Sequence, residues 1–224
     1  MKKTALVTGA SKRIGRSITE YLAETGWDVV VHYNSSERLA SEFVHLLEAK
    51  YPEQLFHPVK ADLADMDDVA AFIPKLISQF GDFQSLINNA SVFNAGYLKE
   101  TSLELYDKQM NVNLKAPFML MRDYANLCKG GNIINLVDTR VTTNRSNFAA
   151  YSISKKALWE LTKMAALEFA PLIRVNAIAP GVTLPPEDKD ENYLFEIAKN
   201  IPMKKPGGVA PIIESIAYIL KNKY

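Results

Sequence analysis

The sequence predicts an α/β fold built as one doubly wound parallel sheet, and two observations lead there. Short apolar runs rich in β-branched residues recur along the chain without alternation, as in strands that are covered on both faces. Longer segments with helical spacing separate these runs, so strand and helix alternate. Because a chain of 224 residues, 48% of them apolar, can bury one substantial core, we expect a single domain over residues 1–224.

The elements follow in order. The expected strands are the runs TALVT, WDVVVHY, LFHPVKA, SLINNA, NIINLV and RVNAIAP. The clearest helical segments are GRSITEYLAETG, SERLASEFVHLLEAKYP and DDVAAFIPKLISQFG, and Gly26 and Gly81 stand where helices would end. The proline-bearing stretch LPPEDKDEN, residues 184–192, falls in an expected substrate-loop region near 183–202. It is either a mobile flap over a site or a solvated surface loop.

Charge and cysteine content exclude several classes of function. Lys plus Arg number 26 and Asp plus Glu 25, so no basic field would draw the protein to nucleic acid or to an anionic membrane. No apolar run approaches the roughly twenty residues that cross a bilayer. The single cysteine and the lack of a signal-peptide pattern predict a cytoplasmic protein. Its 3 histidines have no metal-ligand spacing, so we expect a small-molecule partner and no metal.

The first expected turn, TGASKRIGRS, points to a dinucleotide. Gly9 and Gly15 permit a tight turn and close approach of the backbone to a pyrophosphate at a helix N-terminus. Arg13 stands where a middle glycine is usual. Glycines at such turns also occur for purely structural reasons, so the turn alone is weak evidence.

The end of the second expected strand indicates which dinucleotide. A carboxylate there would bind the ribose hydroxyls of NAD, but HYNSSER has residues 34–36 as Asn, Ser and Ser. Hydroxyl and amide groups, with the charges of Lys12, Arg13 and Arg38, suit a 2′-phosphate. We therefore expect NADPH, with the alternative that Arg38 only begins a solvated helix face.

Tyr151 and Lys155 form a Tyr-x-x-x-Lys pair in a helical pattern and project from one face. An ammonium beside a phenol lowers the pKa of the phenol, which would make Tyr151 usable as a proton donor or acceptor.

With the motifs TGASKRIG, ADL, NNAS, NVNL, YSISK and RVNAIAPG in this order and spacing, the chain resembles the short-chain dehydrogenase/reductase family along nearly its whole length. The resemblance implies a Rossmann-type sheet. It also implies that Asn113 holds a proton-relaying water, Tyr151 exchanges the proton and Lys155 binds the nicotinamide ribose while tuning Tyr151. The cofactor residues implied are Gly9, Ser11, Lys12, Arg13, Ile14, Gly15, Tyr33, Asn34, Ser35, Ser36, Asp62, Leu63, Asn89, Ala90, Ser91, Tyr151, Lys155, Pro180, Gly181 and Val182.

Asp138 occupies the position of the family's catalytic serine. A hydroxyl can donate a hydrogen bond to a carbonyl oxygen, whereas an ionised carboxylate can only accept one. For Asp138 to assist the reaction, either it is protonated, or the substrate presents N–H groups or a ring nitrogen about to become cationic. This indicates reduction of a C=N bond in a nitrogen heterocycle. The alternative is that Asp138 only binds turn amides while Thr139 or Thr142 supplies the hydroxyl.

Within the family, Asp138, Arg13 in the glycine turn and the NNASVF segment resemble the pteridine reductases, including the dihydromonapterin reductase-like branch. The implied substrate-binding residues are Arg13, Ser91, Phe93, Asp138, Tyr151 and Gly181, with the Phe93 ring stacked on the pterin. Alternatively, Phe93 belongs to the core and Arg13 only clamps a phosphate. We expect NADPH-dependent reduction of a dihydropterin or dihydrofolate, with the proton coming from Tyr151 or through Asp138.

The last segment, AYILKNKY, ends where the family continues through another strand and a glycine-rich tail. We therefore expect an exposed sheet edge at the strand that contains Val175. A homotetramer is expected from the family. Two other functions stay open: a carbonyl reductase such as a 3-oxoacyl reductase, and a non-catalytic dinucleotide-binding regulator, against which the intact Asn113, Tyr151 and Lys155 argue.

Overall fold

The computed structural model describes residues 3–186 and 189–222. Its sheet is parallel throughout and has the strand order β3-β2-β1-β4-β5-β6, so the predicted doubly wound fold is confirmed. The strands are β1 (Lys3–Val7), β2 (Trp27–Tyr33), β3 (Phe56–Lys60), β4 (Ser85–Asn88), β5 (Gly131–Leu136) and β6 (Ile173–Ile178), and each overlaps one of the expected runs.

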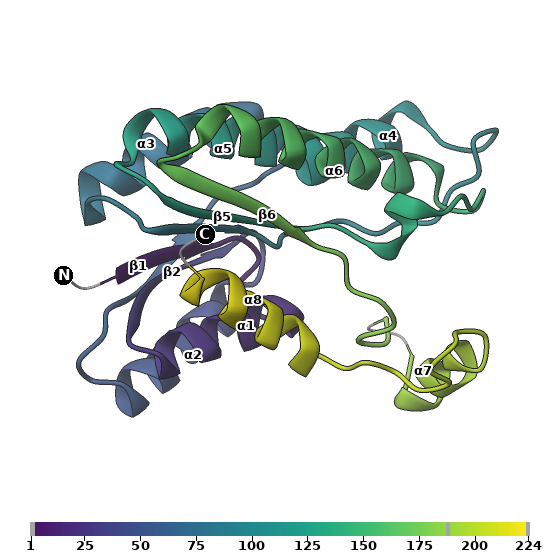
Figure 1. The fold of residues 1–224 in the computed structure, drawn as a ribbon, viewed down its shortest axis with the longest axis horizontal. Coiled ribbons are helices and arrows are strands. Elements are labelled where there is room, and N and C mark those ends of the chain that lie inside the picture. The colour runs from purple at the N-terminus through teal and green to yellow at the C-terminus, as the bar shows by residue number, and fades with distance from the viewer. Residues whose placement is uncertain (1–2, 187–188, 223–224) are drawn as a thin grey trace.

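Helices cover both faces of the sheet. They are α1 (Arg13–Glu24), α2 (Glu37–Lys50), α3 (Met66–Phe80), α4 (Leu103–Met110), α5 (Ala116–Leu127), α6 (Ala149–Phe169), α7 (Glu191–Ala198) and α8 (Ala210–Lys221), with a π-helical turn η1 (Asn111–Lys115) and a 3-10 turn η2 (Thr139–Thr142). In Figure 1, α3, α5 and α6 lie above the sheet and α1, α2 and α8 lie below it. None of the described helices is long and apolar enough to cross a membrane.

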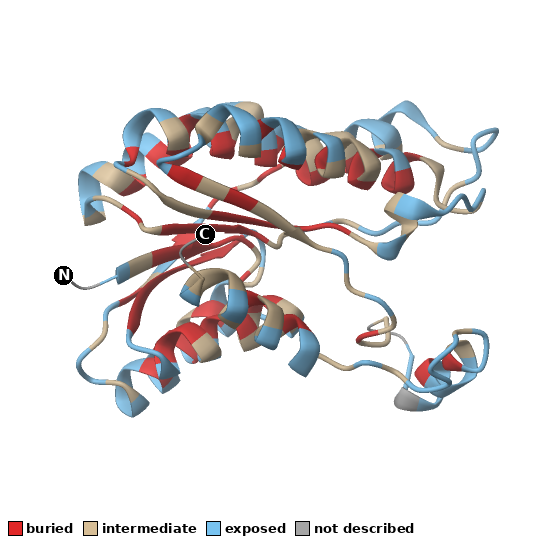
Figure 2. Ribbon diagram, in the orientation of Figure 1, coloured by how far each residue is buried: buried red, intermediate tan, exposed pale blue. Residues whose placement is uncertain are grey.

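The sheet has one apolar cluster on each face. Along β1, Leu6 belongs to the cluster under α3, α5 and α6, whereas Ala5 and Val7 belong to the cluster over α1, α2 and α8. This alternation follows from the strand period of two, and it explains why strands buried on both faces read as continuous apolar runs. Figure 2 shows the buried residues concentrated in the sheet and on the inward sides of the helices.

The predicted helix ends are also found. Gly26 and Gly81 follow α1 and α3 with φ of 83° and 81°, a left-handed conformation in which glycine carries no steric penalty.

At its other end the sheet stops at β6, which, within the described residues, pairs with β5 alone. The edge strand expected at Val175 is therefore unpaired on its outer side within the described residues, although the Val175 side chain is buried. Below it, Arg174 Nη2 donates to the Ile219 carbonyl at 2.7 Å and ties β6 to α8.

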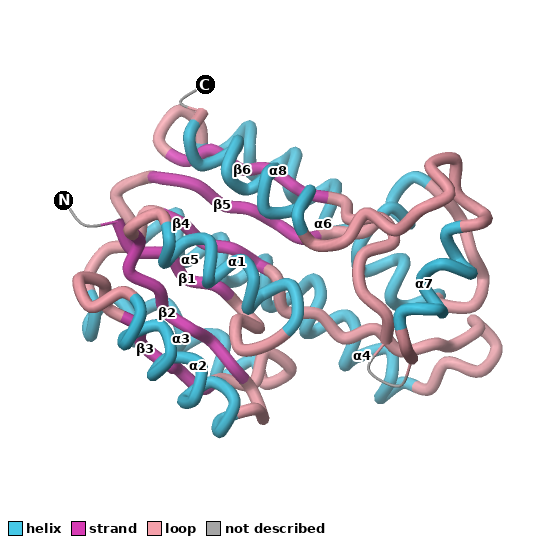
Figure 3. The backbone as a smooth tube through the Cα atoms, turned by 90° about the horizontal axis from the view of Figure 1, so that it is seen from below, coloured by secondary structure: helices cyan, strands magenta, loops and turns pink. Residues whose placement is uncertain are grey.

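The carboxyl ends of all six strands point to one side of the molecule, because the sheet is parallel. The loop after β6 leaves the sheet on this side and leads to α7, which stands apart from the helical layers (Figure 3). Of the expected flap, residues 187 and 188 lie outside the described part of the chain. In this fold, ligands bind outside the carboxyl ends of the strands.

Candidate active site

Two adjoining cavities open at the carboxyl ends of the strands. The larger, of about 500 Å³, follows the glycine turn and the end of β2, and the smaller, of about 240 Å³, lies over Asp138 and Lys155. Arg13, Ile14, Asn89, Ser91, Phe93 and Tyr151 line both. The other predicted cofactor residues along the larger cavity are Gly9, Ser11, Lys12, Gly15, Tyr33, Asn34, Ser35, Ser36, Asp62, Leu63 and Ala90.

The remaining predicted residues divide between the smaller cavity and other places. Lys155, Pro180 and Gly181 line the smaller cavity. Val182 instead lines a separate cavity between the end of β6 and α8, and the Asn113 side chain is fully buried. The structure thus brings most of the predicted residues together at one cleft. Lining residues that the sequence analysis did not single out are His32, Ala64, Val92, Lys108, Val112, Leu136, Val137, Thr183 and Leu184.

The glycine turn leaves room for an anion at the start of α1. A Cβ at Gly15 would overlap the Gly9 carbonyl oxygen, so the turn requires glycine there. Lys12 makes no side-chain cap to α1, and the first turn of the helix has no acidic residue. Uncapped N–H groups at a helix N-terminus that faces a cleft bind phosphate groups, so these residues fit a dinucleotide pyrophosphate.

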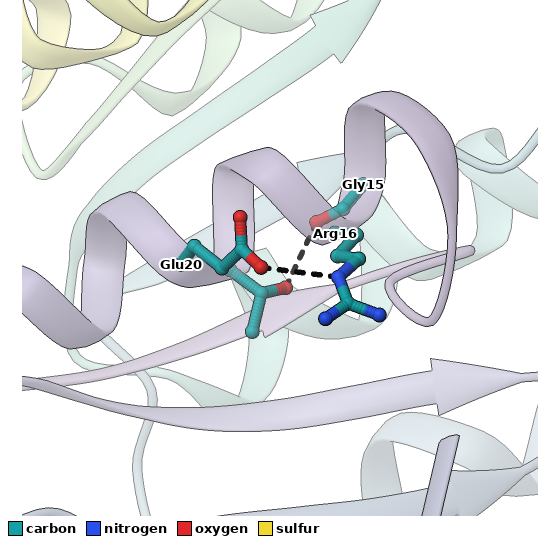
Figure 4. A network of polar contacts seen from close by, with 4 residues as sticks. Gly15, Arg16 and Glu20 are labelled. Carbon is teal, nitrogen blue, oxygen red and sulfur yellow. Dashed lines mark hydrogen bonds and ion pairs between the residues drawn. The ribbon is translucent and has the colours of Figure 1, made fainter. Parts of the chain in front are cut away.

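Arg16 and Arg13, both in the motif, point to different places. Arg16 Nε contacts Glu20 Oε1 at 3.0 Å along the outer side of α1, next to Gly15 (Figure 4). Arg13, with a left-handed φ of 55°, donates from Nη2 to the Pro185 carbonyl at 2.7 Å. Of these two arginines, only Arg13 lines the cleft, and it connects the glycine turn to the start of the expected flap.

His32, for which the sequence analysis predicted no metal-binding role, holds the glycine turn in place through a hydrogen bond. Its Nδ1 accepts a hydrogen bond from the Gly9 N–H at 2.9 Å, and its Nε2 lies 3.1 Å from the Ala61 carbonyl. Burial lowers the pKa of His32 to about 4, so the ring is neutral, with its proton on Nε2. The signal in the sequence was a histidine directly after the apolar run of Val29, Val30 and Val31.

The end of β2 carries no carboxylate at residues 34–36. Ser11 Oγ and Ser36 Oγ lie 2.8 Å apart, and Asn34 Nδ2 donates to Asp62 Oδ1 at 3.0 Å. Arg38 fits the alternative of a solvated helix face, because it pairs with Glu42 at 2.8 Å on the exposed face of α2 and does not line the cleft. The two serine hydroxyls line the larger cavity together with Lys12 and Ser35, and all four side chains can donate to an added phosphate.

Asp138 connects the sheet to the reactive tyrosine. It follows β5 and caps η2, where its Oδ1 accepts the Arg140 N–H at 2.8 Å. Its Oδ2 accepts the Tyr151 hydroxyl at 2.9 Å. Asp138 therefore performs the structural role that we considered as an alternative and faces the site as well.

Thr139 and Thr142 do not supply the hydroxyl that the alternative required. Thr139 and Thr142 are exposed, and Thr142 Oγ1 donates to the Thr139 carbonyl at 3.1 Å. Neither hydroxyl bonds to Tyr151 among the described contacts.

The expected lowering of the Tyr151 pKa is wrong. Burial and the adjacent Asp138 carboxylate raise the pKa of Tyr151, and Arg140 opposes this in part. Lys155 does not counter the shift, since its Nζ lies 5.9 Å from the ring centre and donates to the Leu136 carbonyl at 2.8 Å. Burial lowers the pKa of Lys155 to about 8.

Asn113, in the π-helical turn, supports the loop after β4. Its Oδ1 accepts the Ser91 hydroxyl at 3.0 Å and the Val92 N–H at 2.9 Å, and its Nδ2 donates to the Val92 carbonyl and to Ser154 Oγ. The side chain thus positions Ser91 at the rim of the cleft.

Phe93 is not a core residue, since 49% of it is exposed. Its ring stacks on Phe148, with 4.3 Å between centroids and 5° between planes, and meets the Tyr151 ring edge-on at 4.6 Å. The sequence analysis did not consider Phe148. The stacked rings of Phe93 and Phe148 form an aromatic platform beside Tyr151.

A parallel sheet in this order, with an uncapped glycine turn and a tyrosine–lysine pair at its carboxyl edge, defines a dinucleotide-dependent oxidoreductase of the Rossmann type. The chain belongs to the short chain dehydrogenase family, which matches residues 3–193.

One curated protein and two solved structures illustrate what this chain is similar to. A 3-oxoacyl-[acyl-carrier-protein] reductase, FabG, of Staphylococcus aureus is 33% identical over 100% of this chain and 92% of its own length. The crystal structure of FolM Alternative dihydrofolate reductase 1 from Brucella canis, complexed with NADP, is 32% identical with a TM-score of 0.89, over 99% of this chain and 88% of that one. A blue fluorescent protein from a metagenomic library, in complex with NADPH, is 30% identical with a TM-score of 0.90, over 99% and 91%.

Proposed function

We propose that the protein reduces a C=N bond of a dihydropterin or of dihydrofolate with NADPH, giving the tetrahydro form. One observation carries the proposal: a carboxylate, Asp138, lies beside Tyr151 at the smaller cavity, with Oδ2 2.9 Å from the tyrosine hydroxyl. An ionised carboxylate repels the oxygen of a ketone and accepts hydrogen bonds from ring N–H groups. Substrates with such groups therefore fit this site better than simple ketones do.

The cofactor part of the proposal has its own support. The uncapped start of α1 suits a pyrophosphate. Ser36, whose Oγ lies 2.8 Å from Ser11 Oγ, offers a hydroxyl where NAD-dependent enzymes have an acid. Two similar structures contain NADP or NADPH. The residues proposed to bind NADPH are those along the larger cavity together with Lys155, Pro180 and Gly181 at the smaller one.

When bound, NADPH supplies the hydride that reduces a carbon of the C=N bond. The substrate nitrogen then needs a proton, and the Tyr151 hydroxyl is the proton source. Asp138 holds this hydroxyl by accepting its hydrogen bond, and it can bind N–H groups of the ring. The raised pKa of Tyr151 keeps the phenol protonated until the substrate withdraws the proton.

Lys155 and Phe93 complete the site. The buried Lys155 ammonium lies 5.9 Å from the Tyr151 ring and favours phenolate once the proton has left. Phe93 lines both cavities and offers its exposed ring area to a flat heterocycle.

A second function has support from sequence identity. The 3-oxoacyl reductase is as similar to this chain as the dihydrofolate reductase is, at 33% against 32% identity. Asp138 argues against it because a carboxylate does not donate a hydrogen bond to a keto oxygen.

One experiment separates the possibilities. NADPH consumption is followed with dihydrobiopterin, dihydrofolate and a panel of ketones that includes a 3-oxoacyl thioester. Turnover of a pterin and none of the thioester supports the proposal. Reduction of the thioester without pterin turnover refutes it in favour of the second function, and NADPH binding without any turnover indicates a regulator.

A further inference from the structure

Arg140 is a cation near the site that the proposed chemistry leaves unused. It lies in η2 just after Asp138 and is half-buried. Its Nη1 is buried without a hydrogen-bond partner, and within residues 3–186 and 189–222 the guanidinium makes no ion pair or hydrogen bond. A buried donor on a charged group costs free energy until an acceptor reaches it, so an acceptor that reaches Nη1 would stabilise Arg140.

The Arg140 guanidinium lies against the aromatic platform. Its Cζ is 4.6 Å from the centre of the Phe148 ring and 5.7 Å from the centre of the Phe93 ring. These are cation–π distances, so the rings hold the guanidinium in place while its edges stay available for hydrogen bonds.

The platform is fixed by the backbone. The Gly96 N–H donates to the Asn147 carbonyl at 3.1 Å, and the Ala149 N–H donates to the Gly96 carbonyl at 3.0 Å. These bonds join the loop of Phe93 to the segment that enters α6 at Phe148. Arg140 therefore keeps its place relative to Tyr151, whose ring contacts Phe93.

Arg140 lies beside the cavities and lines neither of them. A ring that rests on Phe93 with its reactive edge at Asp138 and Tyr151 fills the smaller cavity. The Arg140 guanidinium lies 5.7 Å from the centre of the Phe93 ring, so a substituent that extends from such a ring along the platform would meet Arg140. The nearest carboxylate in sequence, Asp138, already bonds to the Arg140 backbone N–H and to Tyr151, so it leaves the guanidinium unpaired.

We propose that Arg140 recognises a carboxylate on the substituent of the substrate ring, so that the site selects dihydrofolate, with its glutamate tail, over dihydropterins with neutral side chains. The inference rests on the proposed function and names the substrate class of that site. A planar guanidinium binds a carboxylate through two parallel hydrogen bonds, which a neutral hydroxylated chain cannot reproduce.

The test compares dihydrofolate with dihydrobiopterin, which share the ring and differ in the charge of the substituent. Arg140→Met keeps most of the apolar length and removes the charge, whereas Arg140→Lys keeps a charge. The matched control is Arg145→Met, which removes a positive charge from an exposed position on the same loop. We measure kcat and KM with each substrate, and by calorimetry the binding of folate to protein saturated with NADP⁺.

In Arg140→Met we expect KM for dihydrofolate to rise about 10- to 100-fold, with weaker folate binding to match and no change in KM for dihydrobiopterin. Arg140→Lys should recover part of the difference, and Arg145→Met should behave as the wild type. An equal rise in KM for both substrates would mean that Arg140 only supports the aromatic platform. An unchanged KM for both would mean that Arg140 does not recognise the substrate. Either outcome overturns the proposal.

Failure of the proposed function gives a different result. If the wild type reduces neither pterin, calorimetry still decides about Arg140: folate binding that is lost in Arg140→Met retains the carboxylate site, and the absence of folate binding overturns it. Should Arg140→Met unfold, as judged by its thermal transition, the Lys variant and the salt dependence of KM for dihydrofolate take its place. A KM that does not rise with salt in the wild type contradicts an ionic contact.

Discussion

Replacement of Asp138 by serine tests the residue on which the proposed chemistry depends. The Oδ2 atom accepts the Tyr151 hydroxyl at 2.9 Å, and Oδ1 accepts the Arg140 N–H at 2.8 Å. Because serine is also a good N-cap residue, the turn at η2 should form without the carboxylate. The change therefore removes the charge that faces the site and keeps the local backbone.

The size of the effect follows from the contacts. A hydrogen bond to a charged group contributes about 1.5–3 kcal/mol, which corresponds to a fall of roughly 10- to 150-fold in kcat/KM for a pterin. The affinity for NADPH should stay unchanged, because Asp138 is not among the residues proposed to bind the cofactor and does not line the larger cavity. Reduction of ketones should increase in the variant, since the serine hydroxyl can donate to a carbonyl oxygen.

The assay is NADPH consumption under steady-state conditions with a dihydropterin and with a ketone, together with a fluorescence titration of NADPH. Asp138→Asn serves as the second variant because it keeps the size and removes the charge. Pterin reduction at the wild-type rate in Asp138→Ser would refute the reasoning and leave Asp138 with its capping role alone.

Three further predictions concern charge, space and cofactor choice. Burial lowers the pKa of Lys155 from 10.5 to about 8, so between these values the unfolded chain holds a proton that the folded protein lacks. The contribution of Lys155 to the free energy of unfolding should therefore rise with pH across this window by about 3 kcal/mol, measured as the difference between the urea unfolding of the wild type and that of Lys155→Met. Gly15→Ala should weaken NADPH binding at least about tenfold in a fluorescence titration, because the added Cβ overlaps the backbone of the turn. Ser36→Asp should lower the ratio of kcat/KM with NADPH to that with NADH at least about tenfold, because the carboxylate would repel a 2′-phosphate.

Each of these has a control or a contradicting result. A pH profile of unfolding that is the same with and without Lys155 would mean that its proton is not lost on folding. Gly26→Ala introduces a side chain at a positive φ of 83° with open space around it, so it should cost stability and leave NADPH binding intact. If Gly26→Ala weakens NADPH binding as much as Gly15→Ala does, the effect of Gly15→Ala does not come from a contact of the glycine turn with the cofactor. An unchanged cofactor ratio in Ser36→Asp would place the phosphate elsewhere.

The fold could be predicted because its signals are local and repeated. Strands buried on both faces give continuous apolar runs, and Leu6 beside Ala5 and Val7 shows how one such run serves both clusters. Short motifs at the ends of these strands meet in space since a parallel sheet brings its carboxyl ends to one side. Most of the predicted cofactor residues therefore line one cleft.

The sequence could not predict contacts that depend on side-chain direction and on distant segments. The spacing of Tyr151 and Lys155 places both on one face of α6, but the ammonium bonds to the Leu136 carbonyl and the phenol bonds to Asp138. The pKa of the phenol is therefore raised before a cofactor binds, against the expectation from spacing. Phe148 gained a role only through its bridge to Gly96, which joins loops far apart in the chain.

The two oxygens of Asp138 explain how one position can change the substrate without changing the fold. The turn after β5 needs a side chain that accepts a backbone N–H, and either a hydroxyl or a carboxylate meets this need. The second oxygen of Asp138 then faces Tyr151, where a carboxylate can only accept a hydrogen bond, whereas a hydroxyl can also donate one. Overall identity cannot separate a reductase of ketones from a reductase of C=N bonds, as the similar values of 33% and 32% illustrate. Selection between the two chemistries should therefore depend on this one side chain, and on Arg140 for the part of the substrate beyond the ring.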